Sequence, residues 1–383
     1  MLDVAAETAR YIDGLGADRL ARAAAYTHGG HWLLLWDAVV TVVAAWLIVR
    51  SRVLHRVARV VGVQRPNRMA FATTATFLLA INVLTLPWTV YGQWWRERLY
   101  DRTSQPLADF LVQQGVGLLI TVIAGALVLT GVYWLLRRMG RRWWIGSTLL
   151  VTGSMALFVL MTPTVIEPLF NEFKPVPPGP VREALVGMAA KAGIPESRLF
   201  VYDGSRQSNN FTANVGGLGS QARVAISDVA LRGASLDEVK AVTGHEIGHY
   251  VLGHVWWKLL SLGFVTLLTL YGTDRLYGKV SGWLGEAASL QDPVGVPVLY
   301  VLVTVVALLV SPADRLVGRQ VETAADNYSL RTVNLPDAMA TALVKSADYR
   351  YPRPGPVEEA LFYDHPSVER RVRNVMQWKA THP

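Results

Sequence analysis

The sequence has no cysteine, and it has few charged residues for its length. The absence of cysteine among 383 residues excludes disulfides, a thiol nucleophile and every metal site that needs a thiolate ligand. A metal ion would therefore have to be held by histidine and carboxylate groups. Charged residues make up 17% and hydrophobic residues 51%, whereas soluble domains carry about 25% charged residues. The chain lacks the polar surface of a soluble protein, and we expect an integral membrane protein that contacts the lipid bilayer.

The positive net charge of +8 does not by itself indicate a nucleic-acid partner. Arginines are concentrated in two short loops between apolar runs, residues 50–69 and 137–142. No basic face with interleaved aromatic side chains accompanies them, although such a face is what binds single strands. The distribution is typical of anchoring charges beside membrane spans, so we expect no nucleic acid among the partners.

Six apolar runs are long enough to cross about 30 Å of hydrocarbon. They cover residues 31–49, 70–91, 110–136, 143–163, 252–272 and 294–311. Residues 1–30 lack the charged start, apolar core and cleavage site of a signal peptide. The predicted fold is therefore mainly α-helical, with about six transmembrane helices and a small α+β domain after the fourth.

Polar segments divide the chain into four parts. These are residues 1–163 with four spans, 164–251, 252–311 with two spans, and 312–383. The second part and the last part are separated by an even number of spans, so they lie on the same side of the membrane and can build one site together.

Within the second part, six prolines interrupt residues 163–180, which predicts a linker or lid. Val181–Ala192 then has helical periodicity. Short strands are predicted at Leu199–Tyr202, 210–215 and 222–226. Two further helices are expected in the last part, at about 313–331 and 336–347, followed by a charged C-terminal helix.

The motif His245-Glu-Ile-Gly-His249 is the strongest indication of function in the sequence. Ser235-Leu-Asp-Glu238 is a capping box, which predicts a helix that starts there, runs through the motif and continues into the following apolar stretch. Residues four apart share one face of a helix, so both imidazoles can bind one zinc ion. Glu246 can reach the attacking water as a general base without binding the metal. We therefore expect one Zn²⁺ per chain.

A catalytic zinc ion needs a third protein ligand. His254 lies nine residues after His245, about half a helical circumference away, so we expect a structural or interfacial role for it. Glu322 is the better candidate, because Glu322 and Asp326 are four apart on a helix just after the sixth span. Glu322 would bind the metal, and Asp326 would accept the N–H of a ligand histidine. Without the motif, such an acidic pair would be a solvated helix face.

These features resemble the type I CAAX prenyl protease family of membrane-embedded zinc endopeptidases. The resemblance rests on the HEIGH motif, on the later Glu-x-x-x-Asp and on the linker Ile166-Glu-Pro-Leu-Phe-Asn-Glu-Phe-Lys-Pro175, over roughly residues 70–375. It implies an integral membrane protein with a small α+β zinc-metallopeptidase domain. It also implies that the spans enclose a chamber limiting access to the zinc.

Two further segments resemble that family. Asn209-Asn210-Phe211, preceded by serine, is similar to an edge strand that binds substrate backbone by strand addition, although Asn210 stands where the family usually has alanine. These three residues are the expected substrate-binding residues. His365 and Arg371 match a His-Pro motif with arginine six residues later. The resemblance implies that they stabilise the oxyanion of the transition state or bind the carboxy-terminal region of the substrate.

Zinc-dependent hydrolysis of peptide bonds is the function that these residues predict, with a peptide or a membrane protein as substrate. Glu246 would take the proton of the attacking water and pass it to the leaving amine. One alternative is a non-catalytic membrane scaffold or transporter-like protein that retains a structural metal site, which would not need Glu246. Another is an intramembrane site-2-type protease, which would need an aspartate in a later span, and residues 294–311 contain none.

Two indications bear on the orientation in the membrane, and they point in opposite directions. The short loops 50–69 and 137–142 hold ten arginines, whereas the alternate segments 1–30 and 92–109 hold six. This difference by itself would place the zinc domain outside the cell. The zinc domain of the resembling family faces the cytoplasm, and long soluble segments weaken the charge count. We therefore expect a multi-pass protein of the cell membrane with its zinc domain in the cytoplasm.

Overall fold

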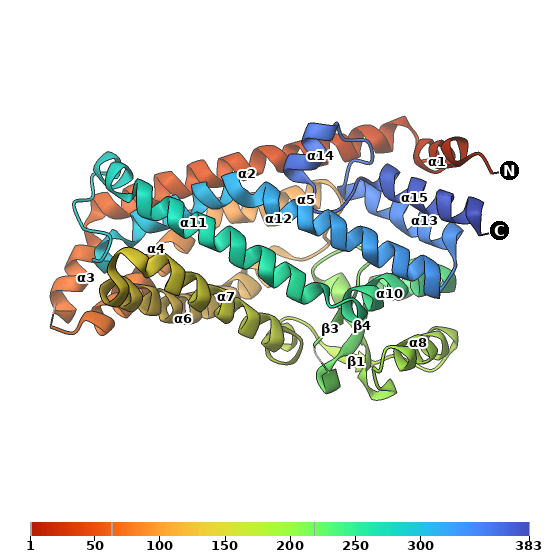
Figure 1. Ribbon diagram of the computed structural model, residues 1–383, viewed down its shortest axis with the longest axis horizontal. Helices are drawn as coiled ribbons and strands as arrows, with labels where there is room; N and C mark the ends of the chain where they lie inside the picture. The colour runs from red at the N-terminus through yellow and green to blue at the C-terminus, as the bar shows by residue number, and fades with distance from the viewer. Residues whose placement is uncertain (1, 63, 218, 383) are drawn as a thin grey trace.

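The computed structural model describes residues 2–62, 64–217 and 219–382. Long helices form one end of the molecule, and a small sheet with shorter helices forms the other (Figure 1). The long helices are α2 (Ala17–Ser51), α4 (Pro66–Val90), α6 (Leu107–Met139), α7 (Trp143–Met161), α11 (His254–Leu284) and α12 (Val296–Thr332). The chain is thus mainly helical, as predicted.

Five continuous helical stretches of the described chain are long and apolar enough to cross a membrane. The third of them covers Leu107–Leu169 and contains both α6 and α7, which are joined by the 3-10 turn Gly140–Arg142. Because α6 and α7 pack against each other, this stretch is a hairpin that can cross twice. The prediction of about six transmembrane helices is therefore close.

The last apolar run and the following polar helix form one element. They were predicted as separate segments, 294–311 and 313–331, but α12 runs through Pro312 without ending. A proline inside a helix removes one backbone hydrogen bond, and here the packing of α12 against α11 and α10 keeps the helix continuous. Glu322 therefore lies on a direct continuation of a membrane span.

The other end of the molecule contains a four-stranded sheet of order β1-β2-β4-β3. Its strands are β1 (Phe173–Pro175), β2 (Leu199–Tyr202), β3 (Ala213–Gly216) and β4 (Arg223–Ser227). β2 pairs with β4 in parallel, and the other two pairings are antiparallel. Strand β2 has the predicted bounds, and β3 and β4 lie close to theirs. β1 lies within the segment that was predicted as a linker because of its prolines. It forms a strand there because it pairs with β2, and the sequence of the segment did not indicate this pairing.

Shorter helices complete the soluble end, and only some of them contact the sheet. They are α1 (Val4–Asp13), α8 (Pro180–Lys191), α9 (Asp228–Gly233), α10 (Leu236–Val251), α13 (Pro336–Lys345), α14 (Pro356–Phe362) and α15 (Val368–Thr381), while α3 (Val53–Val61) and α5 (Arg96–Leu99) adjoin the long helices. One hydrophobic cluster lies between the sheet, α8 and α10. A second joins α1, α13 and α15 to Ala241 of α10 and Leu330 of α12. This second cluster fixes α10 against α12, which positions the histidine motif beside Glu322.

Candidate active site

The capping box at the start of α10 is confirmed. Ser235 Oγ accepts a hydrogen bond from the Glu238 amide at 3.3 Å, and Glu238 Oε2 accepts one from the Ser235 amide at 2.7 Å. The helix that begins there packs closely on α12. A Cβ atom at Gly244 would stand 2.8 Å from Ser329 Oγ, so only glycine allows this approach. The neighbouring His245 is brought within reach of α12 as a result.

Helix α10 does not continue into the membrane, contrary to the prediction. It ends at Val251, and Gly253 adopts a left-handed conformation with φ of 65° before α11 begins at His254. Glycine adopts this conformation without a steric penalty, so the chain can turn sharply here. The turn brings His254 Nδ1 to 2.8 Å from His249 Nδ1.

His245, His249 and Glu322 form one group of potential metal ligands. The two Nε2 atoms lie 3.1 Å apart, and they lie 3.3 Å and 3.5 Å from the carboxylate oxygens of Glu322. Ligand atoms about 2.0–2.1 Å from a tetrahedral zinc ion are roughly 3.3–3.4 Å from one another. Glu322 Oε2 is also buried and accepts no well-aligned hydrogen bond in the described part of the chain, although the Nε2 atoms of His245 and His365 lie 3.3 Å and 3.1 Å from it. The spacing and the buried carboxylate oxygen both fit a metal ion held by these three side chains.

Behind the ligands lies a layer of buried ionic contacts. Asp326 Oδ1 lies 2.8 Å from His245 Nδ1, which is the contact predicted from the sequence. Arg371 donates to both oxygens of Asp326, at 2.8 Å and 2.6 Å. Asp326 is 1% exposed and Arg371 is 8% exposed. Because a buried ion pair of this geometry has little freedom, it holds Asp326, and through it the imidazole of His245, in one orientation.

A cavity of about 200 Å³ opens beside the ligands. We call it the central cavity, and its lining includes Phe211, Ala213, His245, Glu246, Glu322, Tyr349, His365 and Arg371. His365 Nε2 lies 3.1 Å from Glu322 Oε2, and its Nδ1 lies 2.8 Å from Asp364. Five of the predicted site residues of α10, α12 and the C-terminal segment thus meet in this cavity, and Asp326 lies behind them.

Burial changes the protonation of the groups around the cavity. It raises the pKa of Glu246 to about 7, and it lowers the pKa of His249 to about 3 and that of His365 below its usual value. A neutral imidazole is the form that binds metal ions. A carboxylate with a pKa near neutrality can both accept and release a proton at physiological pH.

The three predicted substrate-binding residues occupy different places. Phe211 lines the central cavity, two residues before the start of the edge strand β3. Asn209 instead contacts the loop between α5 and α6: its amide donates to Arg102 O at 2.8 Å, and its side chain donates to Asp101 O at 3.0 Å. Asn210 lines a neighbouring cavity together with Arg102.

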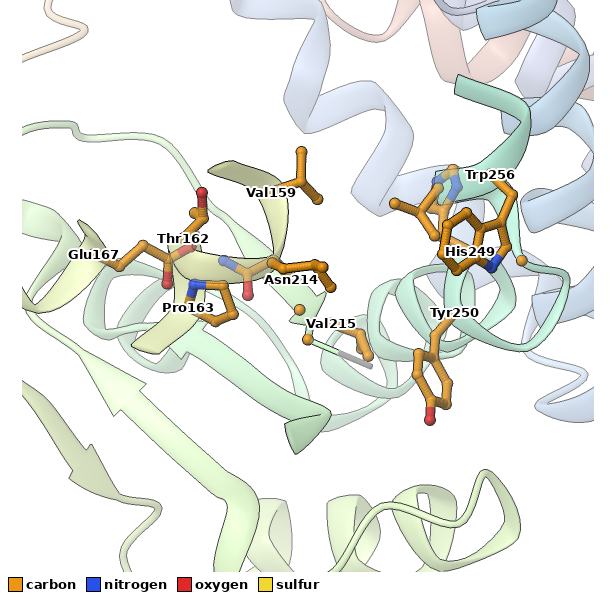
Figure 2. Close-up of a pocket in the computed structure, with 14 residues that line it drawn as sticks. Val159, Thr162, Pro163, Glu167, Asn214, Val215, His249, Tyr250 and Trp256 are labelled. Atoms are coloured by element: carbon orange, nitrogen blue, oxygen red, sulfur yellow. The ribbon is translucent and has the colours of Figure 1, made fainter. Parts of the chain in front are cut away.

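A second, more apolar cavity of about 330 Å³ lies on the other side of His249. Figure 2 shows His249, Tyr250 and Trp256 on one side of this apolar cavity, and Val159, Thr162, Pro163 and Asn214 on the other. It is bounded by the end of α7, the edge strand β3 and the turn into α11. The histidine motif is therefore accessible from two cavities that follow the same edge strand.

Sequence reasoning missed the contact of His254 with His249 and the contributions of the α13–α14 connection, including Tyr349. The signal for His254 was the Gly253 that precedes it, which permits the chain to turn back. The aspartate that a site-2-type site would need is also absent from the ligand group. Asp314, just beyond the last apolar run, instead contacts Ser261 at 2.8 Å and Lys258 at 3.2 Å.

Two regions of the chain match known protein families. Residues 6–172 match the family described as "CAAX prenyl protease N-terminal, five membrane helices", and the described chain has four long apolar helices there, α2, α4, α6 and α7. Residues 177–379 match peptidase family M48. The solved structure of Ste24p from S. mikatae superimposes with a TM-score of 0.74 at 16% identity, covering 94% of this chain and 88% of that chain. This likeness shows a shared fold.

Similar curated proteins include metalloproteases from distant organisms. The Bacillus subtilis protein named "Uncharacterized metalloprotease YhfN" is 26% identical over 79% of this chain and 73% of its own length. The Arabidopsis thaliana protein named "CAAX prenyl protease 1 homolog" is 26% identical with the same coverage. The Homo sapiens homologue is 22% identical over 81% of this chain and 74% of its own length. The chain is therefore a member of peptidase family M48, a metalloprotease with several membrane-spanning helices.

Proposed function

We propose that this protein is a zinc-dependent endopeptidase in which His245, His249 and Glu322 hold the metal and Glu246 is the general base. The observation that carries the proposal is the position of Glu246. It shares the central cavity with His245 and Glu322, two of the three candidate ligands, yet it is not one of the ligand group. A general base must reach the attacking water without occupying a coordination position, and Glu246 meets that condition.

When bound, the zinc ion activates the attacking water and polarises the scissile carbonyl. Glu246 accepts the proton of the water and passes it to the leaving amine. His365 is positioned beside Glu322 to donate to the developing oxyanion. Asp326 accepts the Nδ1–H of His245, which leaves Nε2 free for the metal, and Arg371 holds Asp326 in place. His254 accepts the Nδ1–H of His249 in the same way, since the Nδ1 atoms of the two rings face each other, and Nε2 of His249 is left free for the metal.

The substrates are peptides or membrane proteins, bound along the free edge of β3. β3 is the outer strand of the sheet and pairs only with β4 in the described structure. An extended peptide can add to such an edge through backbone hydrogen bonds. Several relatives are named CAAX prenyl proteases, and peptides attached to the membrane by a lipid are a candidate substrate class on that basis.

The test compares the wild-type protein with Glu246→Gln in detergent. We expect one zinc ion bound by each protein and cleavage of a generic peptide only by the wild type. Glu183→Gln, an exposed glutamate of α8, is the control and should retain activity. A non-catalytic scaffold with a structural metal site predicts a different result: zinc in both proteins and no Glu246-dependent cleavage of any peptide.

We also propose that the metal-binding end faces the cytoplasm. Support comes from the resemblance to the CAAX protease family, against the mild arginine excess of the opposite loops. Reporter fusions at Thr103 and Arg138 test it, because Thr103 precedes α6 and Arg138 lies in its last turn, at the opposite end of the helix. A cytoplasmic signal at Thr103 and none at Arg138 is expected, and the reverse result would overturn the orientation.

A further inference from the structure

A third cavity, of about 230 Å³, adjoins the central cavity. We call it the basic cavity, because Arg19, Arg102 and Lys345 line it and Asp348 is the one acidic side chain in its lining. Phe211, Ala342, Ser346 and Tyr349 line both cavities, so the two are contiguous. A ligand in the central cavity can therefore extend into the basic cavity.

Arg102 differs from the other two cations of the basic cavity. Arg19 is paired with Asp348 at 2.7 Å and 2.8 Å, and Lys345 is paired with Glu238 at 2.8 Å. Arg102 is only 8% exposed, yet its Nε and Nη2 atoms have no hydrogen-bond partner among the residues described. Its guanidinium stacks on the ring of Tyr349 at 4.2 Å, which orients it but supplies no hydrogen-bond acceptor.

An unpaired buried cation is unfavourable unless something neutralises it. The backbone keeps Arg102 in this position, because its carbonyl oxygen accepts the hydrogen bond from the Asn209 amide. Asn210, in the same cavity, also has a buried Oδ1 atom without a partner in the described chain. Within the described chain, the lining of this cavity thus includes both hydrogen-bond donors and an acceptor that lack partners. A carboxylate on a peptide, with its neighbouring N–H groups, supplies the complement of both.

The edge strand β3 indicates which end of a bound peptide would lie at the basic cavity. Residues 209–211 line the basic cavity, Phe211–Ala213 line the central cavity, and Asn214–Gly217 line the apolar cavity. A peptide added antiparallel to β3 runs opposite to this order. Its amino-terminal side then lies at the apolar cavity and its carboxyl-terminal side reaches Arg102. Parallel addition would instead direct a positively charged amino terminus toward Arg102, which is electrostatically unfavourable.

We propose that Arg102 forms a subsite that binds a carboxylate of the substrate on the carboxyl-terminal side of the scissile bond. The carboxylate comes either from an Asp or Glu side chain or from the free carboxyl terminus of the peptide. This proposal rests on the proposed peptidase function, and it adds a selectivity that the zinc site alone does not provide.

The experiment uses two pairs of fluorogenic peptides and the full-length protein in detergent with zinc bound. One pair differs by a terminal carboxylate or carboxamide, and the other by Glu or Gln beyond the scissile bond. We expect the wild type to cleave the carboxylate member of one pair with a kcat/KM about 10- to 100-fold higher. Arg102→Gln should lose this preference, and Arg102→Lys should retain part of it. Whichever pair shows the preference identifies the source of the carboxylate.

Arg22→Gln is the matched control, because Arg22 pairs with the adjacent Asp101 but does not line the cavity. It should keep the preference. If the wild type cleaves both members of each pair at equal rates, the proposed subsite is wrong. The proposed peptidase function would still be supported in that case, provided that the cleavage depends on Glu246. If no peptide is cleaved, fluorescence anisotropy of the same peptides with Glu246→Gln decides. Tighter binding of a carboxylate peptide that depends on Arg102 supports the subsite, and equal affinities overturn it.

Discussion

Gly318 of α12 lies directly against the backbone carbonyl of Asp364. A Cβ atom at position 318 would stand 2.5 Å from the Asp364 oxygen. The adjacent Arg319 donates through Nη1 to the carbonyl oxygens of Glu359 and Tyr363, at 3.0 Å and 2.6 Å. These contacts dock the segment that carries His365 onto the helix that carries the candidate metal ligand Glu322.

Gly318→Ala is expected to lower kcat about 10- to 100-fold, because the added methyl group displaces Asp364 and with it the His365 imidazole. Zinc content should be unchanged, since the three ligands are not displaced. Gly187→Ala in α8, where a Cβ atom meets open space, is the control and should be neutral. Adding Gly318→Ala to His365→Ala should cost no further activity. Fully additive losses in kcat would show that Gly318 does not act through His365.

Asp326→Asn should weaken zinc binding about 10- to 100-fold, because the amide no longer fixes the Nδ1–H tautomer of His245 and leaves Arg371 without its bidentate partner. Competition with a chromophoric chelator measures the affinity. Asp337→Asn removes an exposed carboxylate of α13 and should leave zinc affinity unchanged. Wild-type zinc affinity in Asp326→Asn would remove Asp326 from the ligand-positioning role.

His254→Phe should also weaken zinc binding, by up to about tenfold, because His249 loses the partner of its Nδ1 atom. His254→Gln should recover part of the affinity, since the amide can accept the same hydrogen bond. The same chelator competition measures both variants. If the phenylalanine and glutamine variants bind zinc as tightly as the wild type does, the contact is packing alone.

Peptide cleavage should decrease as the pH falls through and below 7. Burial raises the pKa of Glu246 to about 7, and a general base must be unprotonated to accept a proton. A bound cation favours the carboxylate form, so the acidic limb of kcat/KM is expected at or below this pH. The profile is measured with zinc in excess, and zinc content at each pH separates protonation of Glu246 from loss of the metal. Constant kcat/KM from about pH 8 to pH 5 would contradict this role for the glutamate.

The local features of the site could be predicted from the sequence because they depend on residues close together along the chain. Helical spacing aims His245 and His249 at one point, and the Ser235–Glu238 capping box defines where their helix begins. The strand β2 could be predicted because a short apolar run lies between two turns. Spans follow from the length and composition of apolar runs alone, which is why their number was close to that observed.

The predicted helix boundaries were wrong at two positions, where the backbone conformation differs from what the hydrophobic pattern and the residue types suggest. Gly253 stands between the motif and an apolar run, and its left-handed conformation breaks the helix that periodicity predicted to be continuous. Pro312 led to the opposite error. The proline suggested a boundary between two helices, but packing keeps α12 continuous. In both cases the outcome depends on neighbouring helices, which a single-sequence pattern does not contain.

Composition, helical spacing and residue chemistry are local properties, so the membrane character, the three candidate metal ligands and the glutamate beside them could be predicted from the sequence alone. The groups that surround that site could not be predicted in this way, because they come together only in the folded chain. Arg371 pairs with Asp326, His254 turns back to His249, and Arg102 lies in a cavity next to Phe211 with its Nε and Nη2 atoms lacking a hydrogen-bond partner in the described chain. These contacts join residues from separate helices and loops, and their distances depend on how the whole chain packs.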